Sequence, residues 1–439
     1  MSRPASWTAL FLCCIALPPS ANATVAEPVH PGLERISTAV PWPRGLRFLD
    51  GQLVVLGRGV HRSAGGPQAG IDDQAGHLFR VDPAISEAVV TGETAGAAVR
   101  ANATIFARPT DPPFRLWTGL MPATSDMHTD RPYCMLIWDA PSQNFFICGY
   151  SGIDLATPAR FRKNATDSIL RYDLRDRHWH LVERHDPTVV PPEALGQAVP
   201  ARFYPHHDVA TNDPPHGLVS GPCGAVVAGR YLYCGAKDNT ALAQYRLDDI
   251  RRRPDAGPPP GRLIFHRSGS DDEVYLATEG HGQVYVEGTC ALAVHESWLY
   301  ISFRTTSQIL RFALAADGDL LHPLRGQYIA QFPRYDPDRD GGSANIYDLA
   351  FDQLGRLYVS AGYTGCVYRF TPDPDKLFQA EDGTYGPDPY VDLRALTDHP
   401  RSRAGNICLD QEGNLYIATG NQDVADGQRR GTIYRWRAR

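Results

Sequence analysis

The sequence lacks a hydrophobic run of about 20 residues, the length that a membrane-spanning helix needs. Its apolar N-terminal stretch, Thr8–Pro18, is shorter than that, follows a segment with one arginine and precedes the small-residue motif Ala21-Asn22-Ala23. This order is typical of a secretory signal peptide. We therefore expect residues 1–23 to be a signal peptide and residues 24–439 to form one exported domain, secreted or periplasmic, with no membrane partner.

Motifs of several common protein classes are also missing. The sequence has no GxSxG nucleophile elbow, no phosphate-binding P-loop and no GxGxxG after a predicted strand. It has no CxxC or CxxCH, which argues against a zinc ribbon and a c-type haem. The formal net charge of −6 argues against nucleic acid as a partner.

Cysteine is scarce but regularly placed. Cys134 with Cys148, and Cys223 with Cys234, occupy matching positions on the first and second strands of two predicted hairpins. In an oxidising compartment this favours two cross-strand disulfides. Two reduced, buried pairs are the alternative, because disulfide geometry across a hairpin is restrictive. Three further cysteines leave an odd number, so at least one thiol is expected; these are Cys290, Cys366 and Cys408.

Helix-period segments are absent as well, and a strand-rich repeat fills the chain. The stretch "NIYDLAFDQLGRLYVSAGYTGCVYRFTP" from Asn345 is echoed from Thr289 and from Gly405, with weaker copies upstream. Units of several strands that recur in this way indicate an all-β fold, a single β-propeller. First strands are predicted near Leu46, Met135, Ala225, Leu292, Leu349 and Ile407. Six blades are visible, and the two long intervals leave a seventh open.

The chain ends just after a third-type strand, "TIYRWR", so the last blade needs an outer strand from elsewhere. We predict that the N-terminal segment Leu33–Val40 supplies it and closes the ring, which removes open sheet edges.

The same repeat assigns each loop to one face of the disc. Loops before first strands and after second strands share the face that usually holds ligands. On this face the sequence places Arg58, His61, Arg131, His206, His207, His216, Lys237, Arg304, Tyr363 and Arg403. Convergent cations favour an anionic ligand such as a carboxylated sugar. The plain alternative is that these side chains simply point into water.

Three groups of residues have candidate chemistry. Flanking arginines would keep His61 neutral, as a general base requires. His206 and His207, with His216 downstream, match no standard zinc spacing, so substrate contact or loop packing is preferred to metal. Asp348 and Asn406 occupy equivalent positions in two successive blades. They could meet in the channel and share calcium, or simply fill and hydrate the channel.

The repeats resemble those of NHL-like and gluconolactonase-like propellers. In the first blade, "LGRGVHRSAGG" followed by "IDDQAGHLFRVDP" is similar to carbohydrate-active propellers of the L-rhamnose-α-1,4-D-glucuronate lyase and rhamnosidase type. The resemblance implies a seven-bladed disc, a site centred on His61, a structural calcium ion in the channel, and no other cofactor. It also implies an enzyme that releases terminal rhamnose from anionic gum-arabic-type polysaccharide or oligosaccharide.

β-Elimination at a uronate needs a cation on the carboxylate, a base for the C5 proton and a proton for the leaving oxygen. We assign the base to His61. Neutralisation of the substrate carboxylate is assigned to an arginine or lysine. The candidates are Arg58, Arg131, Lys237 and Arg304. The returning proton is assigned to Tyr133, His207 or His61 itself. Two alternatives stay open: a gluconolactonase-like metal-dependent hydrolase that uses Asp348 and Asn406, and a non-catalytic propeller that binds glycan or protein.

Overall fold

The fold was obtained as a computed structural model. It describes residues 32–40, 42–57, 61–62, 77–84, 103–107, 131–150, 168–184, 222–237, 240–252, 261–267, 273–332, 344–379, 389–397, 403–419, 422–423 and 428–438. Within these ranges no helix is long and apolar enough to cross a membrane.

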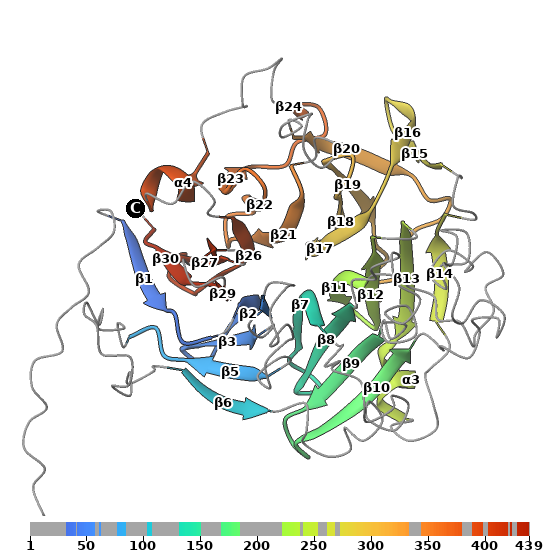
Figure 1. Cartoon of the computed structure of the whole chain (residues 1–439). Helices are drawn as coiled ribbons and strands as arrows, with labels where there is room; N and C mark the ends of the chain where they lie inside the picture. The colour runs from blue at the N-terminus through green and yellow to red at the C-terminus, as the bar shows by residue number, and fades with distance from the viewer. Residues whose placement is uncertain are drawn as a thin grey trace, which may run out of the picture.

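Six sheets stand around a central channel as the blades of a β-propeller (Figure 1). The first strand of each blade lines the channel, and neighbouring first strands contact one another in a closed ring. In blade order these strands are β2 (Pro43–Leu49), β7 (Arg131–Asp139), β11 (Pro222–Ala228), β17 (Thr289–His295), β21 (Ile346–Phe351) and β26 (Ala404–Leu409). The all-β propeller is confirmed. Because the six first strands complete the circle, the seventh blade left open by the sequence and implied by the resemblance is wrong.

The other strands follow outward in antiparallel order. The second strands are β3 (Gln52–Gly57), β8 (Asn144–Tyr150), β12 (Tyr231–Ala236), β18 (Trp298–Phe303), β22 (Leu357–Ala361) and β27 (Leu415–Thr419). The third strands are β5 (Leu78–Val81), β9 (Ser168–Asp173), β13 (Ala241–Arg246), β19 (Gln308–Ala313), β23 (Cys366–Phe370) and β30 (Ile433–Trp436). The outer strands are β6 (Ala103–Ala107), β10 (His178–Arg184), β14 (Gly261–Phe265), β20 (Gly326–Gln331), β25 (Val391–Asp392) and β1 (Leu33–Ser37).

A few elements lie outside this plan. Blade 4 is extended by the hairpin β15 (Val274–Thr278) and β16 (Gly282–Val286), and by β24 (Phe378–Gln379). A separate ribbon consists of β4 (His61–Arg62), β28 (Gln422–Asp423) and β29 (Gln428–Arg430). The described helices are short: α3 (Leu247–Arg252) follows β13, and α4 (Leu393–Leu396) follows β25.

The inner strands are apolar on both faces because each sheet is packed between two neighbours. All five residues of β22 and of β27 are buried. The core is therefore a set of clusters between blades, such as the one where Phe146 of blade 2 meets Leu232 of blade 3. This packing explains why the repeats read as aromatic-rich and apolar along their second strands.

Each first strand carries a β-bulge close to its beginning. Register shifts fall between Arg44 and Leu46 in blade 1, Pro132 and Leu136 in blade 2, Pro222 and Gly224 in blade 3, Thr289 and Leu292 in blade 4, Ile346 and Asp348 in blade 5, and Ala404 and Ile407 in blade 6. A bulge inserts an extra residue and re-aims the side chains around it. The six bulges thus form a ring at one mouth of the channel, where alternation counted from the sequence no longer holds.

The N-terminal strand closes the ring as predicted. Strand β1 pairs antiparallel with β30, with Leu33 opposite Trp436, and it lies at the outer edge of blade 6 (Figure 1). The carboxylate of Glu34 on β1 accepts a hydrogen bond of 2.8 Å from Nε of Arg435 and a further one from Arg437. Charged hydrogen bonds therefore join the first strand of the propeller to β30 and to the residue that follows it.

This closure should depend on pH. Burial raises the pKa of Glu34, but the hydrogen bonds and charges of Arg435 and Arg437 outweigh it and hold the pKa below its ordinary value. A lowered pKa stabilises the fold above the unfolded-state value, and this stabilisation is lost as the pH falls through the folded-state value. We expect Glu34→Gln to lower the free energy of unfolding by about 1 kcal/mol near neutral pH.

Urea denaturation of the two proteins across the acid range measures this effect, and the difference should shrink toward acid. The exposed Glu412, in the turn after β26, provides the control Glu412→Gln. An equal loss in both variants, or a difference independent of pH, would remove Glu34 from the closure.

The predicted hairpin disulfide between Cys223 and Cys234 is wrong. The described cysteines Cys148, Cys223, Cys234, Cys290, Cys366 and Cys408 are buried thiols. Cys234 lies opposite Ala225, and the bulge beside Cys223 turns the Cys223 side chain into a different cluster, with Cys290 and Tyr347. Cys148 Sγ lies 3.8 Å from Cys234 Sγ of the next blade. The side chain of Cys134, its predicted partner, lies outside the described residues.

Candidate functional site

Three arginines from three blades converge on one tyrosine of the predicted ligand face. Nη2 of Arg304, just after β18, donates to the hydroxyl of Tyr363 at 3.3 Å. Nη2 of Arg394, on α4, donates to the carbonyl of Tyr363. The guanidinium carbon of Arg403, just before β26, lies 4.5 Å from the centre of the Tyr363 ring. We call these four residues the Tyr363 arginine cluster.

Local backbone contacts hold Tyr363 at this place. The N–H of Gly362 donates to the carbonyl of Asn345 at 3.0 Å, and the N–H of Tyr363 donates to that of Ala344 at 3.3 Å. A Cβ atom at position 362 would lie 2.0 Å from two ring carbons of Tyr347. Only glycine lets the Tyr347 ring pack there, so Gly362 fixes the turn that presents Tyr363.

The short helix α4 positions Arg394. Asp392 caps it, since one carboxylate oxygen accepts the N–H groups of Arg394 at 2.9 Å and Ala395 at 3.1 Å. A capping carboxylate satisfies N–H groups that the first turn leaves without helical partners. The side chain of Arg394 therefore starts from a fixed backbone.

Another arginine, Arg44 on β2 of blade 1, extends this group of residues below the surface. This side chain is buried, and its guanidinium carbon lies 4.9 Å from the ring centre of Tyr347 and 5.7 Å from that of Trp42. Tyr347 in turn packs on Gly362, next to Tyr363. Stacking of arginine on aromatic faces holds the guanidinium plane in place. A row of arginine and aromatic side chains thus runs from blade 1 to blades 5 and 6, and its members Arg44 and Tyr347 are buried beneath the ligand face.

Asp348 and Asn406 meet in the channel, as predicted. Oδ2 of Asp348 accepts from Nδ2 of Asn406 at 3.2 Å and from the N–H of Ile407 at 3.1 Å, while Oδ1 accepts from the N–H of Leu349 at 2.9 Å. Burial raises the pKa of Asp348, and the charge of Arg47 and these hydrogen bonds offset part of the rise.

This pair alone does not fit a calcium site. Calcium takes six to eight oxygen ligands. Here one carboxylate already accepts three N–H groups, and within the described residues no group of three acidic, histidine or cysteine side chains is placed to hold a metal. A calcium ion at Asp348 and Asn406 stays a prediction, and no step is built on it.

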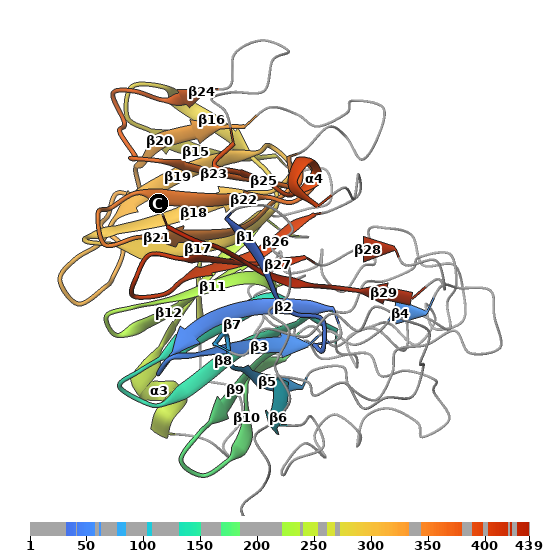
Figure 2. The ribbon, with the colours of Figure 1, turned by 90° about the vertical axis from the view of Figure 1, so that its left-hand side faces the viewer.

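The remaining residues predicted from the sequence differ in how much of each the structure describes. Lys237 is half-buried in the turn after β12, on the ligand face. Arg131 and Tyr133 lie in β7. His61 lies in β4, opposite Arg429 of β29. For Arg131, Tyr133 and His61 the structure describes the backbone and not the side chain. Figure 2 shows the ribbon of β4, β28 and β29 beyond the strand ends of the blades. Arg58, His206, His207 and His216 lie outside the described residues.

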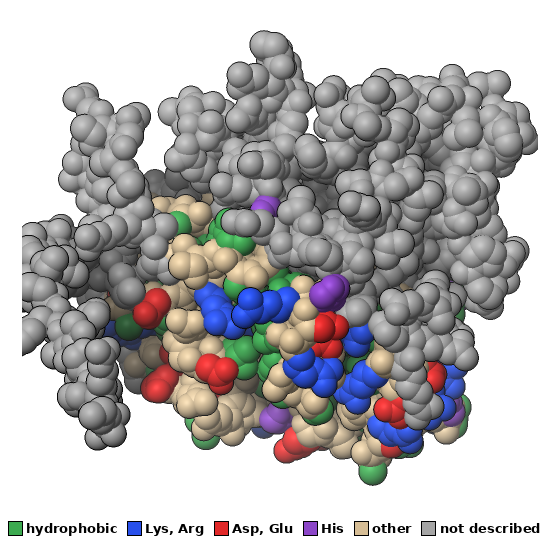
Figure 3. Space-filling view, turned by 90° about the horizontal axis from the view of Figure 1, so that it is seen from below, with side chains coloured by type: hydrophobic (Ala, Val, Ile, Leu, Met, Phe, Trp, Pro, Cys, Tyr) green, Lys and Arg blue, Asp and Glu red, His purple; other side chains and the backbone are tan. Residues whose placement is uncertain are grey.

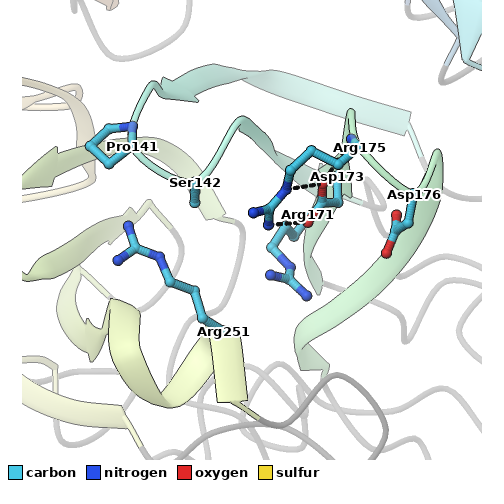
Figure 4. Close-up of a pocket in the computed structure, with 7 residues that line it drawn as sticks. All are labelled: Pro141, Ser142, Arg171, Asp173, Arg175, Asp176 and Arg251. Carbon is cyan, nitrogen blue, oxygen red and sulfur yellow. Dashed lines mark hydrogen bonds and ion pairs between the residues drawn. The ribbon is translucent and has the colours of Figure 1, made fainter.

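A pocket of about 330 Å³ lies on the opposite face, between the turns of blade 2 and helix α3 (Figure 4). It is lined by Pro141, Ser142, Arg171, Asp173, Arg175, Asp176 and Arg251. Arg175 makes two hydrogen bonds to Asp173, at 2.9 and 3.1 Å, and Arg251 pairs with the buried Asp139 at 2.7 Å.

The third arginine of the pocket, Arg171, is buried. Burial lowers its pKa, while Asp173 and Asp176 raise it in part. Each cation here therefore has carboxylates close by, in keeping with the mixed basic and acidic side chains of the described surface in Figure 3. The Tyr363 arginine cluster lies on the face that the sequence predicts to hold ligands, whereas this pocket lies on the opposite face, so the cluster is the candidate site that we consider further.

Comparison with known proteins does not identify a family. The sequence matches no protein-family model, and no curated protein is significantly similar to it. Similar solved structures include the apo form of the soluble aldose sugar dehydrogenase of Escherichia coli, at 12% identity and a TM-score of 0.45, covering 92% of this chain and 98% of that one.

Two others are the PQQ-bound aldose sugar dehydrogenase of Streptomyces coelicolor (14% identity, TM-score 0.42) and a streptogramin B lyase (8% identity, TM-score 0.39). Each covers 92% of this chain and 96% of that one. At these TM-scores the likeness carries no argument about activity.

Proposed function

We propose that the Tyr363 arginine cluster binds the carboxylate of an acidic sugar, and that the protein is an exported carbohydrate-active enzyme. The observation that supports this is the convergence of Arg304, Arg394 and Arg403 on one side chain. Guanidinium groups are well suited to binding carboxylates in proteins. A guanidinium also matches a carboxylate in a two-point contact, which fixes its orientation.

The reaction that suits this cluster is cleavage next to a glucuronic acid, with release of terminal L-rhamnose. In β-elimination, a cation that neutralises the uronate carboxylate acidifies the C5 proton and stabilises the developing negative charge. Of the four cations considered for this step from the sequence, Arg304 is the one in the cluster. His61 would act as the base, and strand β4, which carries it, lies on the same face of the disc (Figure 2).

The proposal is tested with gum arabic as substrate. We expect released rhamnose together with ultraviolet absorbance of an unsaturated uronate. His61→Ala should abolish both while leaving the circular dichroism spectrum unchanged, because general base catalysis contributes roughly 100- to 10,000-fold. Rhamnose without the absorbance would indicate hydrolysis in place of elimination.

Two outcomes contradict parts of the proposal. Near-full activity of His61→Ala would remove His61 from the mechanism. Binding of the polysaccharide without any product would favour the non-catalytic, glycan-binding propeller. Lactonase activity that disappears with a chelator would instead favour the metal-dependent hydrolase.

A further inference from the structure

The sulfur atoms of two cysteines from neighbouring blades are in contact just below the ligand face. Sγ of Cys223, on β11, is 3.2 Å from Sγ of Cys290, on β17. Both cysteines belong to the bulges at the channel mouth, and together with Tyr347 they form one buried cluster. A disulfide needs a separation of about 2.05 Å between the sulfur atoms, so a relative shift of only about 1.2 Å would bring them to bonding distance.

Glycines hold the two strands unusually close at this point. A Cβ atom on Gly224, next to Cys223, would lie 1.7 Å from the carbonyl oxygen of Cys290. A Cβ atom on Gly235 would lie 2.8 Å from Cγ2 of Thr289 and from Cδ1 of Leu292. The backbones of blades 3 and 4 can therefore touch, and neither blade can draw away without opening a gap in the core. The proximity of the two sulfur atoms follows from this packing.

We propose that Cys223 and Cys290 form a disulfide that joins blades 3 and 4 at the mouth of the channel. In the reaction the two thiols lose two protons and two electrons to a disulfide oxidant, which is reduced to two thiols, and one S–S bond forms. The exported location expected from the sequence would provide an oxidant of that class. The bond would hold the two blades together next to Tyr347, on which the Tyr363 turn rests.

Burial decides when this bond forms and how it behaves. Both cysteines are at most 1% exposed, so an oxidant reaches them while the blades are still coming together. Once formed, the bond is shielded from thiol reductants, because exchange requires a thiolate to reach a sulfur atom. We therefore expect it to resist a mild reductant in native buffer and to open when denaturant is added.

Other described cysteines act as internal controls. The sulfur atoms of Cys148 and Cys234 are 3.8 Å apart, a wider separation than in the proposed pair. Burial raises the pKa of Cys366 to about 11, so its thiolate form is rare at neutral pH. Cys366 should remain a thiol under conditions that oxidise Cys223 and Cys290.

Peptide mapping of the full chain tests the proposal. The protein is reduced in denaturant, refolded in the presence of oxidised glutathione, alkylated in denaturant and digested. We expect one peptide pair that joins Cys223 to Cys290, lighter by two hydrogens than the sum of the free peptides, with Cys366 alkylated. Alkylation of both Cys223 and Cys290, or a bond from either to a different cysteine, would overturn the proposal.

Thermal unfolding provides an independent measurement. Cys223→Ser and Cys290→Ser should each lower the midpoint by about 5 °C relative to the oxidised protein, and the double variant should lose no more than either single one. After reduction in denaturant and refolding with reductant, the wild-type midpoint should fall toward those of the variants. Losses that add up in the double variant, or that persist against the reduced protein, would assign them to packing and contradict the bond.

Discussion

Replacing Arg403 with glutamine should weaken binding of a glucuronate-terminated disaccharide by about 10- to 100-fold, the loss expected for one charged hydrogen bond. Arg304→Gln should have an effect of the same size, because both guanidiniums lie on Tyr363 from neighbouring blades. The affinity of the neutral, glucose-terminated disaccharide should hardly change in either variant. Isothermal titration calorimetry at fixed ionic strength measures the affinities of the wild type and both variants for the two disaccharides.

Two further variants test whether the effect depends on the total charge of the protein or on the position of the arginines around Tyr363. Arg262 is half exposed on outer strand β14 and pairs with Asp319, so Arg262→Gln removes one positive charge far from the ligand face and should leave the affinity unchanged. Tyr363→Phe keeps the ring under Arg403 but removes the hydroxyl that accepts from Arg304. It should weaken binding by less than Arg304→Gln. Equal affinities in all variants would place the ligand elsewhere.

The repeat in the sequence was sufficient to predict the propeller and the loops that share one of its faces. Six similar units imply a ring, and the ring puts every loop before a first strand beside the loops that follow second strands. Arg304, Tyr363 and Arg403 could therefore be assigned to one face without coordinates, and the structure brings these three into contact. The N-terminal strand was predictable for the same reason, because the last blade would otherwise lack an edge.

Contacts that depend on bulges and on excursions from the repeat were not predictable. Cys223 and Cys234 look like a pair across a hairpin, but one extra residue in β11 separates their side chains. Equivalent positions of adjacent blades meet around the channel, which brings Cys223 to Cys290 and Cys148 to Cys234. Arg394 was missed because α4 follows an outer strand, and no repeat rule directs such a segment to the ligand face.

Asp348→Ala should lower the free energy of unfolding by about 3 kcal/mol, the largest loss of stability that we predict. The side chain is buried and accepts three hydrogen bonds, of which the two from Asn406 and Ile407 connect blade 5 to blade 6. Its removal would leave the N–H of Ile407 and the amide of Asn406 without this acceptor inside the channel. Urea denaturation monitored by tryptophan fluorescence measures the loss.

The pH dependence of this loss should be opposite in sign to that of Glu34. The pKa of Asp348 is raised in the folded state, mainly by burial. A raised pKa in an acid favours folding at pH values below it, and this contribution fades as the pH rises through the folded-state value. The cost of Asp348→Ala should therefore be greater in mild acid than at neutral pH.

Asp348→Asn distinguishes a channel-filling role from a metal-binding one. Asparagine has the shape of the neutral acid and keeps one carbonyl oxygen, so a role in filling the channel predicts a loss clearly smaller than that of alanine. If Asp348 is a calcium ligand, Asp348→Ala and Asp348→Asn should lower the free energy of unfolding equally. Added calcium should then raise the unfolding midpoint of the wild type alone. Since the carboxylate already accepts three N–H groups, we expect the first pattern and no response to calcium.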